Sequence, residues 1–163
     1  MSIKTSLLGE LKHESINTKK MIERVPTEKL DWRPHEKSMT IGKLATHLAD
    51  LPVWFERIIN ADGFDFATSG RSEKKETTEA ILDQFQKRLN EAEQVLTNAS
   101  DEMLTGTWSL SRNGQLLYQL PKMVALRSFT YNHIYHHRGQ LSVFLRLLDI
   151  PVPGMYGPSA DES

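Results

Sequence analysis

Cysteine is absent from this sequence, and its absence removes several kinds of chemistry at once. The chain can build no disulfide framework, no thiolate metal site and no cysteine nucleophile. Long apolar runs are also missing, since stretches such as Leu51–Phe55 are far shorter than the roughly 20 residues that span a bilayer. The first residues lack a signal-peptide core because Lys4, Glu10 and Lys12 interrupt them. We therefore expect a cytoplasmic protein with no membrane contact, whose thiol chemistry would require an external thiol.

An excess of charge of either sign is missing as well. Lysine and arginine together number 20, against 21 aspartates and glutamates, which gives a formal net charge of −1. Because no overall positive field attracts nucleic-acid phosphates, we expect no nucleic-acid partner. Apolar residues make up 39% of the 163 positions, which is enough to bury one core. We expect a single domain over residues 1–163.

Hydrophobic spacing predicts four long helices joined by connections of unequal length. Their expected bounds are about residues 3–25, 40–60, 78–98 and 121–149. The second helix has Ser38 or Thr40 available as its N-cap. Pro52 lies inside that helix, so we expect a kink one turn after His47.

A hairpin signal lies between the third and fourth helices. Asn113 and Gly114 divide two short runs with partial apolar alternation. Asn-Gly tolerates the positive φ angles of a type I′ turn, so the pattern predicts a small β-hairpin over residues 107–120. The expected fold class is therefore all-α, a four-helix bundle with a short hairpin before the last helix.

The stretch NHIYHHRGQL, residues 132–141, contains three histidines within five positions. Positions four apart on a helix differ by about 40°, so His133 and His137 project side by side. The same face carries Leu126, Thr130, Gln140 and Phe144. We therefore expect this face to be the core-facing side of the last helix.

The neighbours of this pair are expected to point elsewhere. His136 lies about 60° from His133, at the edge of the stripe, and Arg138 points nearly opposite to the pair, toward water. His47 lies on the otherwise leucine-lined inward stripe of the second helix.

Two interpretations of these histidines stand about even on physical grounds. Buried neutral histidines with both nitrogens hydrogen-bonded are common, and they need no ligand. Burying three imidazoles among apolar side chains nevertheless costs free energy, and a divalent cation would satisfy all three together. Three histidine ligands with an open position form a catalytic type of metal site, whereas structural zinc sites usually close with four ligands.

Three stretches, TIGKLATHLADLPVWF, FTYNHIYHHRGQLSVFLRLLDIPVP and YGPSADE, together resemble the DNA-damage-inducible, DinB/YfiT-like family of small bacterial four-helix proteins. The resemblance covers nearly the whole chain and implies an up-down-down-up bundle. It also implies a divalent metal, commonly nickel or zinc, held by His47, His133 and His137. His136 falls between the matched positions and could at most support a ligand.

The resemblance defines the reaction less narrowly than it defines the fold and the metal ligands. Some relatives are transferases that add low-molecular-weight thiols such as bacillithiol or mycothiol to electrophiles, and others are described as metal-dependent hydrolases. We expect a metal-dependent thiol transferase acting on a small molecule, with a hydrolase or a non-catalytic metal-binding or interaction bundle as alternatives. The sequence identifies no general base, so the catalytic residues stay unknown.

Two further expectations concern the surface. His13 and His35 match no ligand of the family and are expected in solvent. The family often forms homodimers through its helices, and Trp54, Phe64 and Phe66 offer apolar surface for such a contact.

Overall fold

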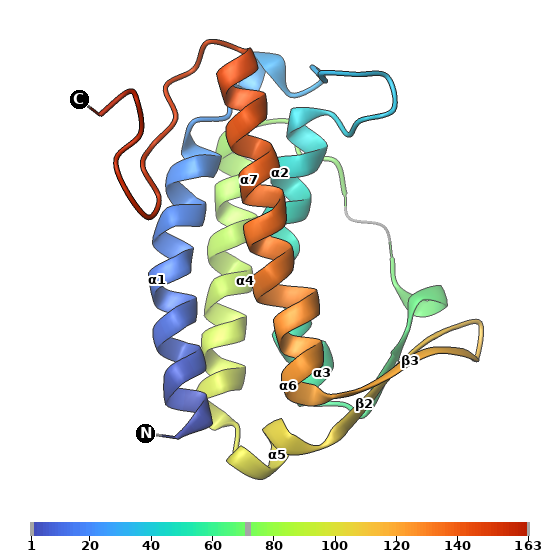
Figure 1. Ribbon diagram of the computed structural model, residues 1–163. Coiled ribbons are helices and arrows are strands. Elements are labelled where there is room, and N and C mark those ends of the chain that lie inside the picture. The colour runs from blue at the N-terminus through green and yellow to red at the C-terminus, as the bar shows by residue number, and fades with distance from the viewer. Residues whose placement is uncertain (1, 71–72, 163) are drawn as a thin grey trace.

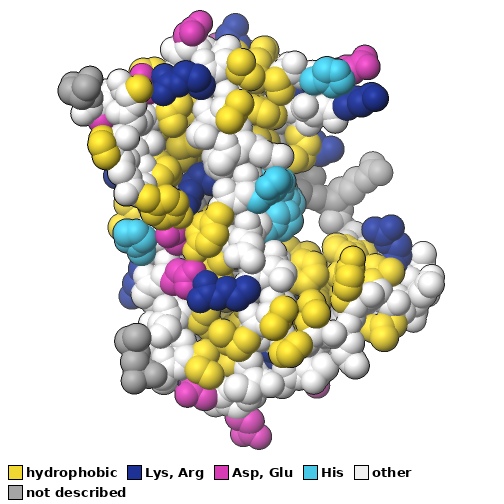
Figure 2. Space-filling view, viewed as in Figure 1, with side chains coloured by type: hydrophobic (Ala, Val, Ile, Leu, Met, Phe, Trp, Pro, Cys, Tyr) yellow, Lys and Arg dark blue, Asp and Glu magenta, His cyan; other side chains and the backbone are white. Residues whose placement is uncertain are grey.

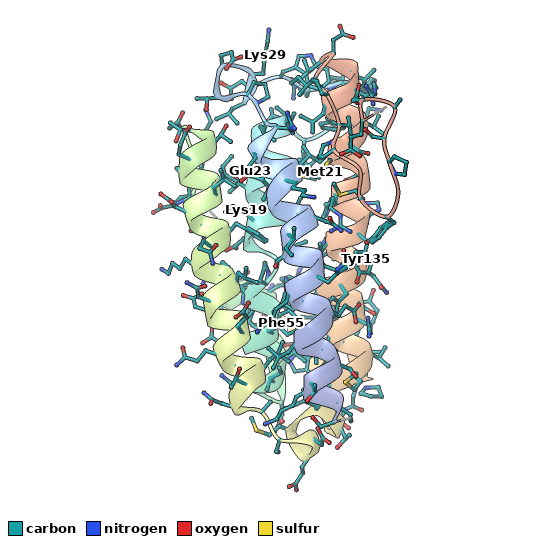
Figure 3. All side chains as sticks on the ribbon, turned by 90° about the vertical axis from the view of Figure 1, so that its left-hand side faces the viewer. Lys19, Met21, Glu23, Lys29, Phe55 and Tyr135 are labelled. Atoms are coloured by element: carbon teal, nitrogen blue, oxygen red, sulfur yellow. The ribbon has the colours of Figure 1, made fainter. Side chains whose placement is uncertain are left out.

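The computed structural model describes residues 2–70 and 73–162. Its long helices form an up-down-down-up bundle, as expected, with a small sheet projecting beside one end (Figure 1). Seen from the side in Figure 3, α1 lies between α4 and α7. The helices of the bundle are α1 (Ile3–Glu23), α2 (Ile41–Asp50), α3 (Val53–Ile59), α4 (Thr78–Asn98), α6 (Lys122–Leu126) and α7 (Asn132–Leu147), and a short helix α5 (Asp101–Thr105) joins α4 to the sheet.

The second predicted helix is two helices, α2 and α3, separated by Leu51 and Pro52. Thr40 is the N-cap of α2, where its side-chain oxygen accepts the backbone N–H of Lys43 at 3.2 Å. Pro52 has no N–H to continue the α2 hydrogen-bond ladder, and it precedes the first residue of α3. A kink within one helix was predicted at Pro52, and the structure has a break between two helices there.

The last predicted helix is continuous but not uniform. It starts with α6, passes through a π-helical turn over Arg127–Tyr131, and continues as α7. A π turn holds about one residue more than an α turn, so it rotates the following helix by about 100° relative to an unbroken α-helix. The side chains before and after this turn therefore follow different helical phases.

This rotation explains one wrong prediction. Arg138 does not point toward water: it is 3% exposed, and its guanidinium pairs with Glu14 of α1. Counted along an unbroken helix from the buried Leu126, Arg138 falls about 120° away; with the extra residue removed from the count, the two lie about 20° apart. Arg138 consequently turns into the core.

The sheet contains three strands in the order β1-β2-β3. Asn113 and Gly114 have φ angles of 51° and 76°, which confirms the predicted turn between β2 and β3. Asp65 accepts hydrogen bonds from the backbone N–H groups of both residues, at 3.0 and 2.7 Å. The strands are β1 (Gly63–Asp65), which is parallel to β2, and the antiparallel pair β2 (Thr107–Arg112) and β3 (Gln115–Pro121).

An aromatic cluster joins the sheet to the bundle. Trp54 of α3 stacks on Phe129 of the π turn, with ring centroids 5.3 Å apart, and contacts Trp108 of β2 edge-on. Phe64 and Phe66 pack against the same indole. Trp54 is only 7% exposed, so its expected role as free surface for a dimer is wrong, because the sheet covers it.

The tail after α7 returns along α1 (Figure 1). Asn17 of α1 donates to the carbonyl of Met155 at 3.4 Å, and the Tyr156 hydroxyl donates to Glu14 at 2.8 Å. Asp161 pairs with Arg146 of α7 and holds the tail against that helix. The stretch YGPSADE thus fastens α1 to α7.

Candidate metal centre

His47 of α2 meets His133 and His137 of α7 at the side of the bundle. One ring nitrogen from each histidine lies within 4.8 Å of the corresponding nitrogens of the other two. The Nε2 atoms of His47 and His133 are 3.3 Å apart. Figure 2 shows histidine side chains at the inner end of a hollow on this face of the molecule. The structure therefore brings together the three histidines that the sequence singled out.

Hydrogen bonds on the far side of the two α7 rings fix their orientation. His137 Nδ1 lies 2.7 Å from the side-chain oxygen of Gln140, which can only accept, so this nitrogen carries the proton. The His133 ring donates to the backbone carbonyl of Phe129. Since His133 Nε2 faces His47, Nδ1 is the donor to Phe129. Both arrangements leave an Nε2 lone pair directed at the cluster.

Burial keeps these imidazoles neutral. It is the largest cause that lowers the pKa of His47, His133 and His137, and all causes together lower the pKa of His133 from 6.5 to about 4. The other rings of the cluster contribute to the lowered pKa of His133, because one imidazolium disfavours a second nearby. At neutral pH the cluster therefore offers lone pairs instead of positive charges.

One nitrogen–nitrogen distance in the cluster agrees with a tetrahedral divalent metal. Two nitrogens each about 2.0–2.1 Å from a tetrahedral zinc are separated by about 3.3 Å, which agrees with the distance between the Nε2 atoms of His47 and His133. Within residues 2–70 and 73–162, no aspartate, glutamate or further histidine joins the group. Three imidazoles with a fourth position left free suit zinc or nickel.

Comparison with known proteins places the chain among its relatives. A family model described as DinB family matches residues 1–163. The chain belongs to the DinB family. The uncharacterized protein YrdA of Bacillus subtilis (strain 168) is 27% identical to it over 152 residues, which cover 91% of this chain and 85% of YrdA.

Solved structures of DinB-like proteins share the fold. A DinB-like protein from Bacillus cereus ATCC 10987 superposes with a TM-score of 0.67 at 23% identity, covering 91% of this chain and 95% of the other. The DinB-like protein YjoA from Bacillus subtilis gives a TM-score of 0.70 at 14% identity, covering 97% and 99% of the two chains. Both agree with the bundle that the sequence predicted for this DinB protein.

The remaining histidines of this DinB protein lie outside the cluster. His13 and His35 are exposed, as expected. His136 is also exposed, although its ring centroid lies 4.9 Å from that of His137. His136 therefore serves as a control for substitutions of the candidate ligands, because it is a histidine of α7 outside the cluster.

A pocket of about 670 Å³ opens beside the cluster, and His47 is the histidine that lines it. Lys43, one turn earlier on α2, lines the same pocket. Sequence reasoning missed this lysine and the role of Gln140. Their spacing from His47 and His137, four and three residues, was the signal available, because such neighbours share a helix face.

No described helix combines the length and the apolar character that crossing a membrane requires.

Proposed function

We propose that this DinB protein is a cytoplasmic metalloprotein in which His47, His133 and His137 hold a nickel or zinc ion, and that it transfers a low-molecular-weight thiol, such as bacillithiol, to an electrophilic small molecule. The observation that carries the proposal is the convergence of three neutral imidazoles from two helices with no fourth protein ligand in the described chain. A bound divalent cation lowers the pKa of a coordinated thiol or water, which supplies a nucleophile near neutral pH.

The residues around the cluster support this role by orientation. The side-chain oxygen of Gln140 and the Phe129 carbonyl each accept a hydrogen bond from the N–H on the far side of a ring, which fixes the tautomer that presents Nε2. The pocket at His47 provides the approach from solvent.

The absence of cysteine from the chain favours an external thiol as the sulfur nucleophile. Water in place of the thiol would make the protein a hydrolase, and a closed site would make it a non-catalytic metal-binding bundle. The test is elemental analysis of protein purified without added metal, followed by conjugation of thiols to a chromogenic electrophile with and without chelator. We expect one divalent ion per chain and chelator-sensitive thiol transfer. Metal-free protein, or transfer unaffected by chelation, would contradict the proposal.

A further inference from the structure

The pocket beside His47 has walls of different character. Leu30 is 6% exposed and Met39 is half-buried, and both pack against the hydrophobic core. The charged residues among its lining are Lys43, Lys74, Lys75 and Glu73. The pocket is therefore apolar on one side, and cations outnumber anions around it.

The three lysines differ in how their charges are balanced. Lys74 lies 3.2 Å from Asp31 and 3.6 Å from Glu76, and Lys75 lies 3.9 Å from Glu73. Lys43 forms no salt bridge with any carboxylate of the described residues. The uncompensated positive charge at this pocket is therefore that of Lys43.

Lys43 is also the lysine tied most directly to the histidine cluster. It precedes His47 by four residues on α2, which places both side chains on one face with Cβ atoms about 5–6 Å apart. The two side chains line one cavity, so one small molecule can touch both.

We propose that this pocket selects a small molecule that carries a carboxylate or phosphate group beside an apolar portion, with Lys43 as the residue that binds the anion. The apolar portion lies against Leu30 and Met39, and the reacting end lies at His47. The inference rests on the proposed function, for which it names the class of substrate. An ion pair of this kind favours an anionic ligand over its neutral analogue by about 2- to 5-fold, because Lys43 is exposed.

The test uses three ligands of one size: benzoate, benzyl alcohol and benzylamine. Amide chemical shifts of Lys43, Thr46 and His47, which line the pocket, are followed by NMR during each titration. We expect benzoate to bind about 2- to 5-fold more tightly than benzyl alcohol, and benzylamine to bind least. Added salt should narrow the difference, because the ammonium of Lys43 is solvent-exposed.

Substitutions of Lys43 test whether this residue binds the carboxylate of benzoate. Lys43→Gln should remove the preference for benzoate, and Lys43→Glu should reverse the order in favour of benzylamine. Lys87→Gln, on the exposed face of α4, is the matched control and should keep the wild-type order. Equal affinities for the three ligands in the wild type, or an unchanged order in Lys43→Gln, would overturn the proposal.

Metal-free and zinc-loaded proteins are titrated separately. A preference for benzoate that appears only with zinc and survives Lys43→Gln would place the anion at the metal and overturn the role of Lys43. Failure of zinc to bind would contradict the proposed function, while the titrations of metal-free protein would still decide the role of Lys43.

Discussion

Two histidines of the candidate site, His133 and His137, each have a separate partner that orients the ring. Gln140 positions His137, the Phe129 carbonyl positions His133, and His47 comes from another helix to complete the group. The ligand set is therefore divided between one rigid pair on α7 and a single partner on α2. Removing the single partner tests the group without disturbing the pair.

His47→Ala should weaken metal binding by an order of magnitude or more, since even the loss of a residue that only orients a ligand costs about 10- to 100-fold. The helices should survive, because alanine is a good helix former and His47 is only half-buried. His136→Ala, which removes an exposed histidine of α7, should bind metal like the wild type. Metal content and circular dichroism of the three proteins provide the measurement; equal metal content in His47→Ala would remove His47 from the site.

The lowered pKa of His133 predicts how the metal-free protein responds to acid. Its folded pKa is about 4 against an ordinary value of 6.5, so the unfolded chain takes up this proton first as the pH falls. The contribution of the neutral imidazole to stability is complete above pH 6.5 and is lost progressively toward pH 4.

We therefore expect the wild type to lose stability relative to His133→Gln between these two pH values. Urea unfolding of both chelator-treated proteins, repeated across the pH range, measures the difference. A difference that stays constant with pH would show that the His133 pKa is the same in the folded and unfolded chains.

At the scale of helices and strands, the sequence predicted the helix ends and turns that depend on adjacent residues. The N-cap Thr40, the break at Pro52 and the Asn113-Gly114 turn each depend on a few adjacent residues, and all three are present. The convergence of His47 with the α7 pair was reached by adding family resemblance to helical spacing, since physical grounds alone left the metal undecided.

The failures arose where distant segments decide the structure. The burial of Arg138 depends on the π turn and on Glu14 from another helix, and the covering of Trp54 depends on the sheet. The pairing of β1 with β2 joins segments that are over 40 residues apart in the sequence, so no local pattern predicts it. Periodicity assigns faces only while the helix keeps one pitch.

The ion pair between α1 and α7 should be important for stability. The side chains of Arg138 and Glu14 are 4% and 9% exposed, so Arg138→Ala leaves a buried carboxylate without its cation, at a cost of about 3–5 kcal/mol. Arg127→Ala removes a comparable pair with Glu10 whose side chains are 42% and 25% exposed, and should cost about 1 kcal/mol or less. Urea denaturation of both variants tests the ranking; equal losses would contradict it.

The π turn should determine whether His133 and His137 of α7 point toward His47. Deleting Ser128, which is exposed within that turn, converts the segment toward α-helix and rotates one half against the other by about 100°. We expect metal affinity to fall by at least 10-fold in deleted protein that still folds, because His133 and His137 turn away from His47. Ser128→Ala, which keeps the length of the chain, should bind normally. Isothermal titration with zinc compares the two, and normal affinity in the deletion variant would mean that the turn does not set the site.

Among the described residues of the whole molecule, three exposed apolar side chains are consecutive in the hairpin, while others lie on α1, α5, α6, α7 and the tail. In β3, Leu116, Leu117 and Tyr118 are 58%, 42% and 57% exposed, and β3 is an edge strand of the described sheet. The segment Gln115–Pro121 carries no charge that would oppose pairing with a second copy. We propose that the expected homodimer forms along this edge instead of through Trp54.

Leu117→Lys should therefore shift the protein toward monomer, because a charge on an edge strand opposes pairing between sheets. Val143→Lys, which places the same charge on the exposed face of α7, should leave the dimer intact. Light scattering over a range of concentrations measures both. Dissociation by Val143→Lys alone would move the interface to the helices, and a wild type that stays monomeric throughout would exclude the dimer.

The π turn also changes how a ligand motif in such chains has to be recognised. The last helix consists of two α-helical segments, α6 next to the hairpin and α7 with the histidines. The one extra residue of the π turn between them sets the rotation of α7 about the helix axis relative to α6. A related chain without that residue would carry the same H-x-x-x-H spacing and still direct both rings away from its second helix. Ligands should therefore be transferred between relatives by counting the residues from Leu126 to His133, in addition to matching the histidines themselves.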